Sequence, residues 1–455
     1  MIGGTPQLCL GVMLGAANLV AWAAAATGAG DRQLCPLCHG QQAGAWRRGA
    51  GDDGPAALRL LDNRERNGRN NRMTDRFAGA FDPRFLRADG ERTATANERV
   101  VMSLLSRRGA ASRAELARAT ALAPHSVSRL IEPLIDRGLV EEGAPEIAGR
   151  GKPGAPLRLV PDAVFSVGIS VMTDAVTLVV VDFGGTVRAH AAAPLDAADF
   201  GAGVRQIAAL LAETTAEADL DPARRLGIGC GVTGYFVGDG ARLNPPASLD
   251  SWALLPLDEL LAQALGGPVW VDNDGNVAAV GEAMLGVGRT CANFAYLYFA
   301  AGFGGGVFAG GAPLRGASGN AGEFASILPE GWQQPNLETL RRHLADRGIV
   351  HDGLAEMLRD LDVTLPAVEE WLDRCAPSLS LVVSAISGTL DPEMIVFGGR
   401  LPPELADRMI AKMRFTNPAR RGYHRPVPRM VPSTIGVDAT AVGAAMMPIR
   451  AAFFQ

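Results

Sequence analysis

The chain has 455 residues, of which 48% are apolar and 20% are charged. That length exceeds one ordinary domain, and the apolar content is sufficient for at least two packed cores, so we expect a soluble multidomain protein. The formal net charge of -5 excludes a basic surface over the whole molecule. A nucleic-acid function therefore requires a local basic face, and charge alone neither supports nor excludes DNA binding.

The first 72 residues carry two features of exported proteins. Residues 8–26 resemble the apolar core of a signal peptide, and Cys35, Cys38 and His39 match a c-type haem attachment motif. Against export, no Lys or Arg precedes the apolar stretch, the basic region after the motif lacks core periodicity, and a candidate DNA-binding segment follows. We therefore interpret residues 1–72 as a disordered extension, or as upstream sequence that is not translated, with Met73 as the start.

Three of the six cysteines lie far apart within apolar segments of the main body, namely Cys230, Cys291 and Cys375. This usage is typical of reduced core thiols and favours a cytoplasmic location.

Residues 73–160 contain the pattern of a small helical DNA-binding domain. Asn97 can cap a first helix that ends near Arg108. Ser112 and Glu115 form a capping box, in which each side chain satisfies the other's backbone N–H, so a second helix is expected to begin there.

A third helix is predicted from Pro124, a residue suited to the first position of a helix. Its apolar residues recur at helical spacing: Val127, Leu130, Ile131 and Leu134. Its outward residues are the candidate base-reading groups: His125, Ser126, Ser128 and Arg129. Pro133 removes one helical hydrogen bond and is expected to bend the helix.

Residues 138–143 then resemble a strand that enters a β wing, and residues 149–154 a basic, flexible return. Arg150 and Lys152 in this return are expected to contact phosphates or a minor groove. An ordinary helical bundle with a solvated basic loop is the alternative, since each piece alone is common. Three helices, a wing and a basic tip in this order favour DNA binding.

Residues 161–455 change to an α/β pattern. Residues 165–170 and 176–182 are β-rich, and a turn follows at residues 183–185, which predicts an antiparallel meander. A helix over 204–216 and a buried strand over 226–232 come next.

The large segment resembles the ROK family of repressors and sugar kinases, and the likeness extends over nearly everything from Asn97 onward. Five motifs occur in family order: Gly227-Ile228-Gly229-Cys230-Gly231-Val232-Thr233-Gly234; Val271-Asp272-Asn273-Asp274-Gly275-Asn276 with Gly281-Glu282; Gly302-Phe303-Gly304-Gly305-Gly306; Gly316-Ala317-Ser318-Gly319-Asn320-Ala321-Gly322-Glu323; and Asp391-Pro392-Glu393 with Gly398-Gly399. The resemblance implies a winged helix-turn-helix followed by a two-lobed, actin-like, sugar-kinase-like domain.

Four residues carry the sugar site that the resemblance implies. Asp274 matches the base of the family's kinases and Asn273 a residue that hydrogen-bonds the sugar, while Glu323 and Glu338 match positions that contact sugar hydroxyls. The alternative is that these side chains merely cap turns.

The chain departs from the family's kinases where a nucleotide would bind. The turn that should hold Asp and Gly reads Ser170-Val171-Met172-Thr173-Asp174, and Ala301 stands where the family usually has Thr. Phosphates with Mg²⁺ need oxygen ligands and close approach by Gly backbone. A literal Asp-x-Gly-Gly-Thr begins at Asp182, but it follows the second strand, so we interpret it as an ordinary turn with a positive φ. ATP chemistry is therefore not expected.

The zinc site that the family commonly carries is also not expected. Ser326 replaces its His, and residues 328–338 contain no Cys. We predict no metal and no cofactor. Because that His normally also helps to hold the sugar, its loss puts the identity and affinity of the ligand in doubt.

The sequence thus predicts a cytoplasmic, non-enzymatic transcriptional regulator, a repressor or an activator. Its partners are a double-stranded DNA operator, a sugar or sugar-derivative effector and a second copy in a homodimer, with no membrane contact. An active sugar kinase with an added DNA-binding module, and a constitutive DNA-binding protein with a vestigial domain, are the alternatives. The thermal response of the protein to sugars and to ATP with Mg²⁺ distinguishes them.

Overall fold

The computed structural model describes residues 94–144, 155–238, 242–414, 417, 419–436 and 438–455. The predictions for residues 1–72, including the apolar stretch and the cysteine motif, lie outside the described residues, as do Arg150 and Lys152. Within the described ranges, no helix is both long and apolar enough to cross a membrane.

Residues 94–144 and 155–160 form three helices and a small antiparallel sheet of order β1-β3-β2. The elements are α3 (Ala96–Arg108), β1 (Ala111–Ser112), α4 (Arg113–Thr120), α5 (Pro124–Asp136), β2 (Val140–Glu142) and β3 (Pro156–Leu159). Fully buried apolar side chains form their core: Val101, Leu105, Leu116, Val127, Ile131 and Leu134. The stripe predicted for the third helix therefore faces this core, except that Leu130 is only partly buried.

The helix starts are fixed by local hydrogen bonds. Ser112 caps α4 with Glu115, as predicted. The prediction for α3 is wrong by two residues: Thr95 is the cap, because its side chain accepts from the Glu98 N–H while Glu98 accepts from the Thr95 N–H at 2.6 Å. Helix α5 begins at Pro124 and continues through Pro133.

The first lobe is built on a five-stranded sheet of order β10-β7-β4-β5-β6. Its strands are β4 (Phe165–Val171), β5 (Ala175–Asp182), β6 (Val187–Pro194), β7 (Arg225–Val232) and β10 (Val269–Asn273). The antiparallel meander is confirmed in β4, β5 and β6, whereas β7 and β10 pair in parallel. Helices α6 (Phe200–Glu217) and α7 (Leu257–Leu265) share an apolar core with this sheet.

Helix α13 (Ala439–Phe453) packs against the other face of this sheet at very short range. A Cβ atom added at Gly168 of β4 would overlap the Ala441 carbonyl, and one at Gly229 of β7 would overlap the Ala444 carbonyl. Glycine in these strands therefore serves close packing between strand and helix.

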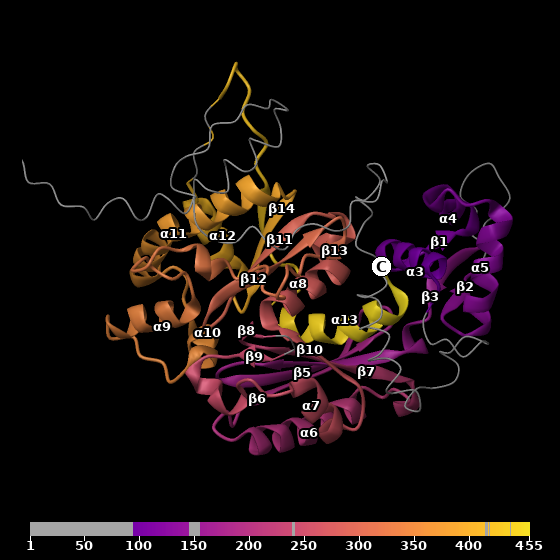
Figure 1. Cartoon of the computed structure of the whole chain (residues 1–455), viewed down its shortest axis with the longest axis horizontal. Coiled ribbons are helices and arrows are strands. Elements are labelled where there is room, and N and C mark those ends of the chain that lie inside the picture. The colour runs from indigo at the N-terminus through magenta and orange to yellow at the C-terminus, as the bar shows by residue number, and fades with distance from the viewer. Residues whose placement is uncertain (1–93, 145–154, 239–241, 415–416, 418, 437) are drawn as a thin grey trace, which may run out of the picture. The chain divides into compact units, whose positions relative to one another are not determined.

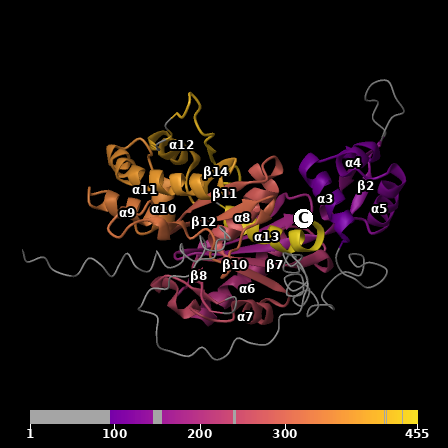
Figure 2. The same ribbon diagram turned by 45° about the horizontal axis from the view of Figure 1, so that its top comes forward.

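The second lobe is built on a sheet of order β13-β12-β11-β14-β15. Its elements are α8 (Asp274–Leu285), β11 (Phe294–Phe299), β12 (Phe303–Ala309), β13 (Ala312–Pro313), α9 (Leu337–Ala345), α10 (Leu354–Asp360), α11 (Pro366–Leu390), β14 (Met394–Gly399), α12 (Pro403–Lys412) and β15 (Arg429–Pro432). Figures 1 and 2 show α13 and α8 between the two sheets, with α6 and α7 outside the first sheet and α11 and α12 outside the second.

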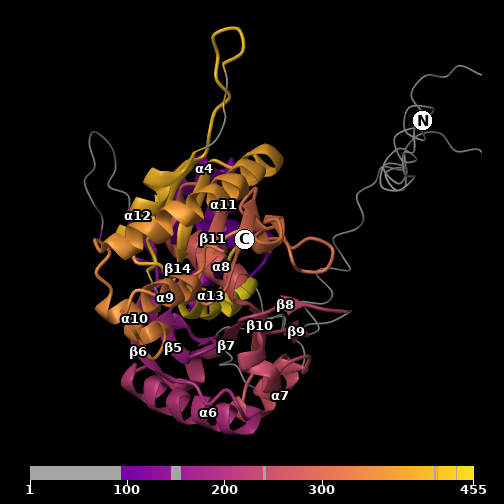
Figure 3. The same cartoon turned by 90° about the vertical axis from the view of Figure 1, so that its left-hand side faces the viewer.

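Short elements complete the fold. They are the hairpin β8 (Tyr235–Phe236) and β9 (Leu243–Asn244), and the 3-10 turns η2 (Pro161–Ala163), η3 (Pro222–Arg224), η4 (Ala247–Trp252), η5 (Val287–Arg289) and η6 (Phe324–Ile327). Figure 3 shows the β8–β9 hairpin beside β10.

Cys230, Cys291 and Cys375 are buried and form no disulfide, as expected for core thiols.

Helix α3 is joined to the lobes by polar contacts. Arg289 of η5 donates to the carbonyls of Ser106 and Arg107, at 3.3 and 2.8 Å. The Gln455 N–H donates to the Ser103 hydroxyl at 3.0 Å, and the Ala94 N–H to the Ala452 carbonyl at 3.2 Å.

Candidate functional site

A cavity of about 310 Å³ lies where β10 ends and α8 begins. Residues of both lobes line it: Thr233, Gly234, Tyr235, Asn244, Pro245, Pro246, Asn273, Asp274, Tyr298, Ala300, Gly302, Phe303, Gly304 and Glu323. The structure therefore brings Asn273, Asp274 and Glu323 together. This volume and the mixture of aromatic and polar groups suit one small polar ligand.

Asp274 is the first residue of α8 and is almost fully buried. One of its carboxylate oxygens accepts from the Thr233 hydroxyl at 2.8 Å and the other from the Gly275 N–H at 2.9 Å. Burial raises the pKa of Asp274 from 3.8 to about 6, although these hydrogen bonds oppose the shift. The group can thus accept a hydroxyl proton or hydrogen-bond a ligand hydroxyl near neutral pH.

Asn273 is the N-cap of α8. Its Oδ1 accepts from the N–H groups of Gly275 and Asn276, at 2.9 and 3.1 Å, and its Nδ2 donates to the Gly234 carbonyl at 2.6 Å. These bonds occupy the oxygen fully, so only the second Nδ2 hydrogen remains for a ligand. Asn273 lines the cavity as predicted, and it also has the capping role that the alternative interpretation gave it.

Glu323 lies at the end of the glycine-rich loop, directly before η6. Burial raises the pKa of its carboxyl, and the negative charge of Asp274 raises that pKa further. Two carboxylates of like negative charge therefore share one cavity, and a ligand with several hydroxyl donors would relieve their repulsion.

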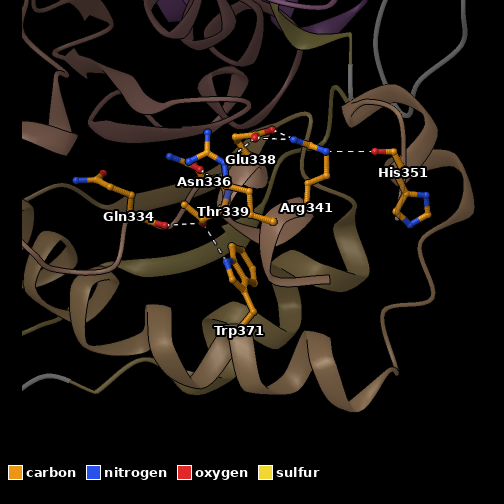
Figure 4. A network of polar contacts seen from close by, with 8 residues as sticks. Gln334, Asn336, Glu338, Thr339, Arg341, His351 and Trp371 are labelled. Atoms are coloured by element: carbon orange, nitrogen blue, oxygen red, sulfur yellow. Dashed lines mark hydrogen bonds and ion pairs between the residues drawn. The ribbon is translucent and has the colours of Figure 1, made fainter. Parts of the chain in front are cut away.

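Glu338 does not line this cavity, contrary to the prediction. Its carboxylate accepts from Arg341, at 2.9 Å on both oxygens, and from Arg342 at 2.8 Å, and these contacts lower the pKa of Glu338 (Figure 4). The helical spacing of three and four residues places both guanidinium groups beside it. The carboxylate is thereby occupied within α9.

Among the cavity residues that the sequence reasoning missed, three carry hydroxyl groups. Thr233 belongs to a motif that was recognised, but its bond to Asp274 was not foreseen. Tyr235 is 45% exposed, and its hydroxyl accepts from Asn244 at 2.7 Å. Tyr298 is buried, and its hydroxyl accepts from Thr440 at 3.1 Å. An alternating β pattern gave no signal that Tyr298 lines a cavity.

The loop around the cavity is held by polar contacts between distant segments. The Asn320 side chain accepts from the Phe236 N–H and donates to the Phe236 carbonyl, both at 2.8 Å, and so binds the backbone of the β8–β9 hairpin. Arg315 forms an ion pair with the buried Asp272, the residue before Asn273. These contacts position the glycine-rich loop over the start of α8.

Ser326 lies outside the cavity lining, and its hydroxyl donates to the Glu323 carbonyl at 2.6 Å. It therefore holds a turn and contributes no ligand contact comparable to an imidazole. Among the described residues, one group of possible metal ligands has atoms within 4.8 Å of one another: His351, Glu356 and Asp360. None of the three lines the cavity, and Asp360 is paired with Arg359.

The first hairpin turn, between β4 and β5, is closed by an ion pair. Asp174 accepts from Arg400, which follows β14 of the second lobe, at 2.7 and 3.0 Å. Arg400 is only 8% exposed. Ser170 is buried, and its hydroxyl has no hydrogen-bond partner among the described residues. This turn therefore presents a carboxylate and the side chain of Met172.

The second turn, at Asp182, is the ordinary turn that the sequence predicts. Asp182 accepts from the Thr186 N–H at 2.9 Å, and Gly185 has a φ of 89°. It joins β5 to β6 and does not line the cavity.

The candidate DNA-reading residues lie on the first half of α5. His125 and Arg129 are exposed, whereas Ser126 and Ser128 are partly buried. The Ser128 hydroxyl donates to the Pro124 carbonyl at 3.3 Å, and Ser126 lies 3.5 Å from the His125 ring. Arg129 forms no ion pair with any described residue, so its guanidinium is free for another partner.

Residues 167–337 match the model of the ROK family. The chain is 28% identical over 370 residues to the uncharacterized protein y4fQ of Sinorhizobium fredii, a match covering 79% of this chain and 92% of that protein. A ROK family transcriptional regulator, a homolog of the Escherichia coli MLC protein, has a similar structure, with 21% identity, a TM-score of 0.57 and coverage of 78% of this chain and 96% of that one.

A ROK family glucokinase from Streptomyces griseus, solved with glucose and AMPPNP, has the same fold. The match has 20% identity and a TM-score of 0.51, and it covers 62% of this chain and 98% of the glucokinase. Regulators and kinases are thus both among the proteins that share this fold.

Proposed function

The chain contains a ROK family domain, and we propose that it is a DNA-binding transcriptional regulator of carbohydrate genes whose ROK domain senses a sugar without phosphorylating it. Two features of one chain carry the proposal: three helices with a small sheet at 94–144 and 155–160, and a polar cavity between two lobes.

The DNA-binding part of the proposal is supported by three helices that precede an antiparallel sheet. In a helix-turn-helix, the first helix of the motif crosses the DNA backbone and the second lies in the major groove, and these would be α4 and α5 here. Here α5 presents His125 and Arg129 near its N-terminal end, both exposed, and Arg129 has no ion-pair partner in the described part of the chain. Arg150 and Lys152 are proposed to contact phosphates from the loop between β2 and β3.

The two solved structures cover different shares of this chain, which agrees with a separate segment before the ROK domain. The regulator's structure covers 78% of this chain and the glucokinase's 62%, although both are covered nearly completely themselves. The difference corresponds in size to the segment before the ROK domain. A kinase fold alone therefore leaves α3 to α5 without a counterpart.

The non-catalytic part of the proposal is supported by the first hairpin turn. A polyphosphate needs backbone N–H groups and an open path there. Asp174 instead places a carboxylate in the turn, and its ion pair with Arg400 ties the turn to the second lobe. The Asp174 carboxylate is thereby occupied, and the pair would have to break before that carboxylate could bind the Mg²⁺ of a nucleotide.

The proposed effector is a hexose-like polyol. Asp274 and Glu323 supply carboxylate acceptors, Asn273 an amide donor, and Tyr235 and Phe303 aromatic surface. A site built to hydrogen-bond hydroxyls leaves costly unpaired groups when the ligand lacks them. Because neither Ser326 nor Glu338 contributes, we expect weaker binding than in a site with the full set.

The test is operator affinity with and without the best sugar of a hexose panel, in wild type and in Asp274→Ala. Sugar should change the affinity of wild type by about 5-fold to 150-fold, the usual range of allosteric coupling. Asp274→Ala should retain the sugar-free operator affinity and lose the sugar response, since a ligand shifts an equilibrium only through differential binding. A response that survives undiminished places the sensing site elsewhere.

Two other functions remain as alternatives, each with an observation in its favour. Asp274, bonded to Thr233 inside a cavity, has the surroundings of a kinase base and favours an active sugar kinase. The paired Glu338 favours a vestigial, ligand-free domain. A rise in melting temperature with ATP and Mg²⁺ plus sugar supports the first, and no rise with any sugar supports the second.

A further inference from the structure

A second cavity, of about 140 Å³, lies where α3 meets the second lobe and the carboxyl end of α13. Its lining includes three arginines, Arg107 on α3, Arg289 in η5 and Arg450 on α13. No Asp or Glu belongs to the lining. The three arginines give the cavity three formal positive charges, and the terminal carboxylate of Gln455, which also lines it, gives one negative charge. The formal charge of the lining is therefore positive.

The guanidinium of Arg450 is the central group. Among the described residues it forms no ion pair, and its one recorded partner is the ring of Phe308, whose centroid lies 5.8 Å from Cζ. Burial, together with the positive charges of Arg99 and Arg315, lowers the pKa of Arg450. Arg450 is partly buried, and a cation that is partly removed from water is stabilised by a counter-ion.

The other two arginines come from opposite sides of the cavity, Arg107 from α3 and Arg289 from η5. Arg289 already donates to the Ser106 and Arg107 carbonyls, and these bonds do not neutralise its charge. Arg107 is exposed and forms no ion pair with a described residue. The hydroxyls of Ser103 and Ser106 line the same cavity and add hydrogen-bond donors, whereas the Thr290 hydroxyl donates to the Val287 carbonyl at 3.3 Å.

We propose that this cavity binds a phosphate group, either inorganic phosphate or the phosphate of a small monoester. Arginine is the side chain best suited to phosphate, because its planar donors pair with two oxygens at once. The volume is below the range of about 300–1,000 Å³ usual for drug-sized ligands, so it suits a small anion. The bound anion attracts Arg107 on α3 and Arg450 on α13 together, and so holds α3 against the lobes.

Isothermal titration calorimetry of the full chain tests the site, with potassium phosphate and glycerol 3-phosphate at constant ionic strength in chloride. Wild type should bind one equivalent saturably. Arg450→Met should weaken binding by about tenfold or more, as expected for a lost charge-assisted contact, and Arg107→Gln should weaken it severalfold. Arg108→Gln is the matched control, since Arg108 is the exposed neighbour outside the lining, and its affinity should be unchanged.

Melting temperature separates a binding defect from misfolding. Arg450→Met should melt no lower than wild type in phosphate-free buffer, because it removes a partly buried charge that has no ion-pair partner among the described residues. It should also lose the rise in melting temperature that phosphate gives wild type. Tighter binding of glycerol 3-phosphate identifies a monoester as the ligand, and equal or tighter binding of phosphate identifies the free ion. No saturable binding of either by wild type, or unchanged affinity in both Arg450→Met and Arg107→Gln, overturns the proposal.

Whether the bound anion also changes the affinity for DNA depends on the proposed function. The calorimetry contains no DNA and no sugar, so the anion site and the regulatory function can fail independently.

Discussion

At the scale of single residues, burying the Asp274 carboxylate in the cavity lowers the stability of the folded protein at neutral pH. Its carboxylate is 5% exposed and accepts hydrogen bonds from Thr233 and Gly275. The folded-state pKa of about 6 exceeds the ordinary value of 3.8, so the folded chain binds more protons than the unfolded chain between those two pH values. The free energy of unfolding therefore falls as pH rises from about 4 to about 6 and is lowered by a constant amount above that.

Asp274→Asn should accordingly stabilise the ligand-free protein at neutral pH, because the amide carries no charge to bury. The gain should approach about 3 kcal/mol at pH 7.5, shrink between pH 6 and pH 4, and vanish below pH 4. Urea unfolding at four pH values measures it. Asp407→Asn, at an exposed position of α12, controls for the change in net charge. A gain that does not depend on pH would contradict this account.

The roles of single residues could be predicted where one local sequence pattern determines them. The predicted ligand contacts failed or were incomplete where a second local pattern, such as helix capping or an ion pair within a helix, uses the same side chain. Asn273 occupies a strand-to-helix junction, where asparagine is a preferred N-cap, so capping accounts for most of its hydrogen bonds. Glu338 has arginines three and four residues later, and that spacing was visible in the sequence. The resemblance to a family gave the position of Glu338 but could not show that its own helix occupies the carboxylate.

At the scale of elements, α5 decides whether the N-terminal segment can read DNA. Arg129 is exposed and without an ion-pair partner among the described residues, one turn after the start of the helix. Arg113, on α4, is instead held by Glu132 and Glu142, at 3.0 and 2.7 Å. Arg129 is therefore the better placed of the two to pair with a guanine edge.

Arg129→Ala should weaken specific operator binding by about 1–3 kcal/mol and leave random duplex almost unchanged, because a base contact contributes only to the matching sequence. Arg118→Ala is the comparison, since Arg118 is exposed on α4, the helix expected to cross the backbone. It should weaken both duplexes alike. Fluorescence anisotropy at a fixed salt concentration measures both. Equal, small losses on the two duplexes for Arg129→Ala would rule out α5 as the recognition helix.

Elements were predicted well where their signals are local. The meander and its turn at Asp182 followed from β-rich runs separated by glycine, and the helix starting at Pro124 from its first residue. The Asp174–Arg400 pair joins residues 226 positions apart, and no sequence pattern links them. Tyr298 is similar, because its contact with Thr440 of α13 exists only after the two sheets have packed around that helix.

At the scale of the whole molecule, α8 connects the two proposed sites. It begins at Asp274 in the cavity and runs 12 residues to Leu285, a length of about 18 Å. The turn η5 follows, and its last residue, Arg289, bonds the Ser106 and Arg107 carbonyls of α3. A ligand that shifts the start of α8 therefore acts on a helix whose far end is connected, through η5, to α3 of the proposed DNA-binding segment.

Arg289→Ala should separate sensing from DNA binding. The variant keeps every residue that lines the cavity at Asp274, so its sugar affinity without DNA should stay within about twofold of wild type. The ratio of operator affinities with and without sugar should fall toward one. Reciprocity requires the same loss in the other direction, so operator should no longer alter sugar affinity. Arg225→Ala is the control, because Arg225 also donates to a carbonyl, that of Gly266, but both residues belong to the first lobe. Anisotropy with labelled operator, with and without sugar, gives both coupling factors. Full coupling in Arg289→Ala would instead assign the connection to α13, whose end reaches α3 through the Ala94–Ala452 and Ser103–Gln455 hydrogen bonds.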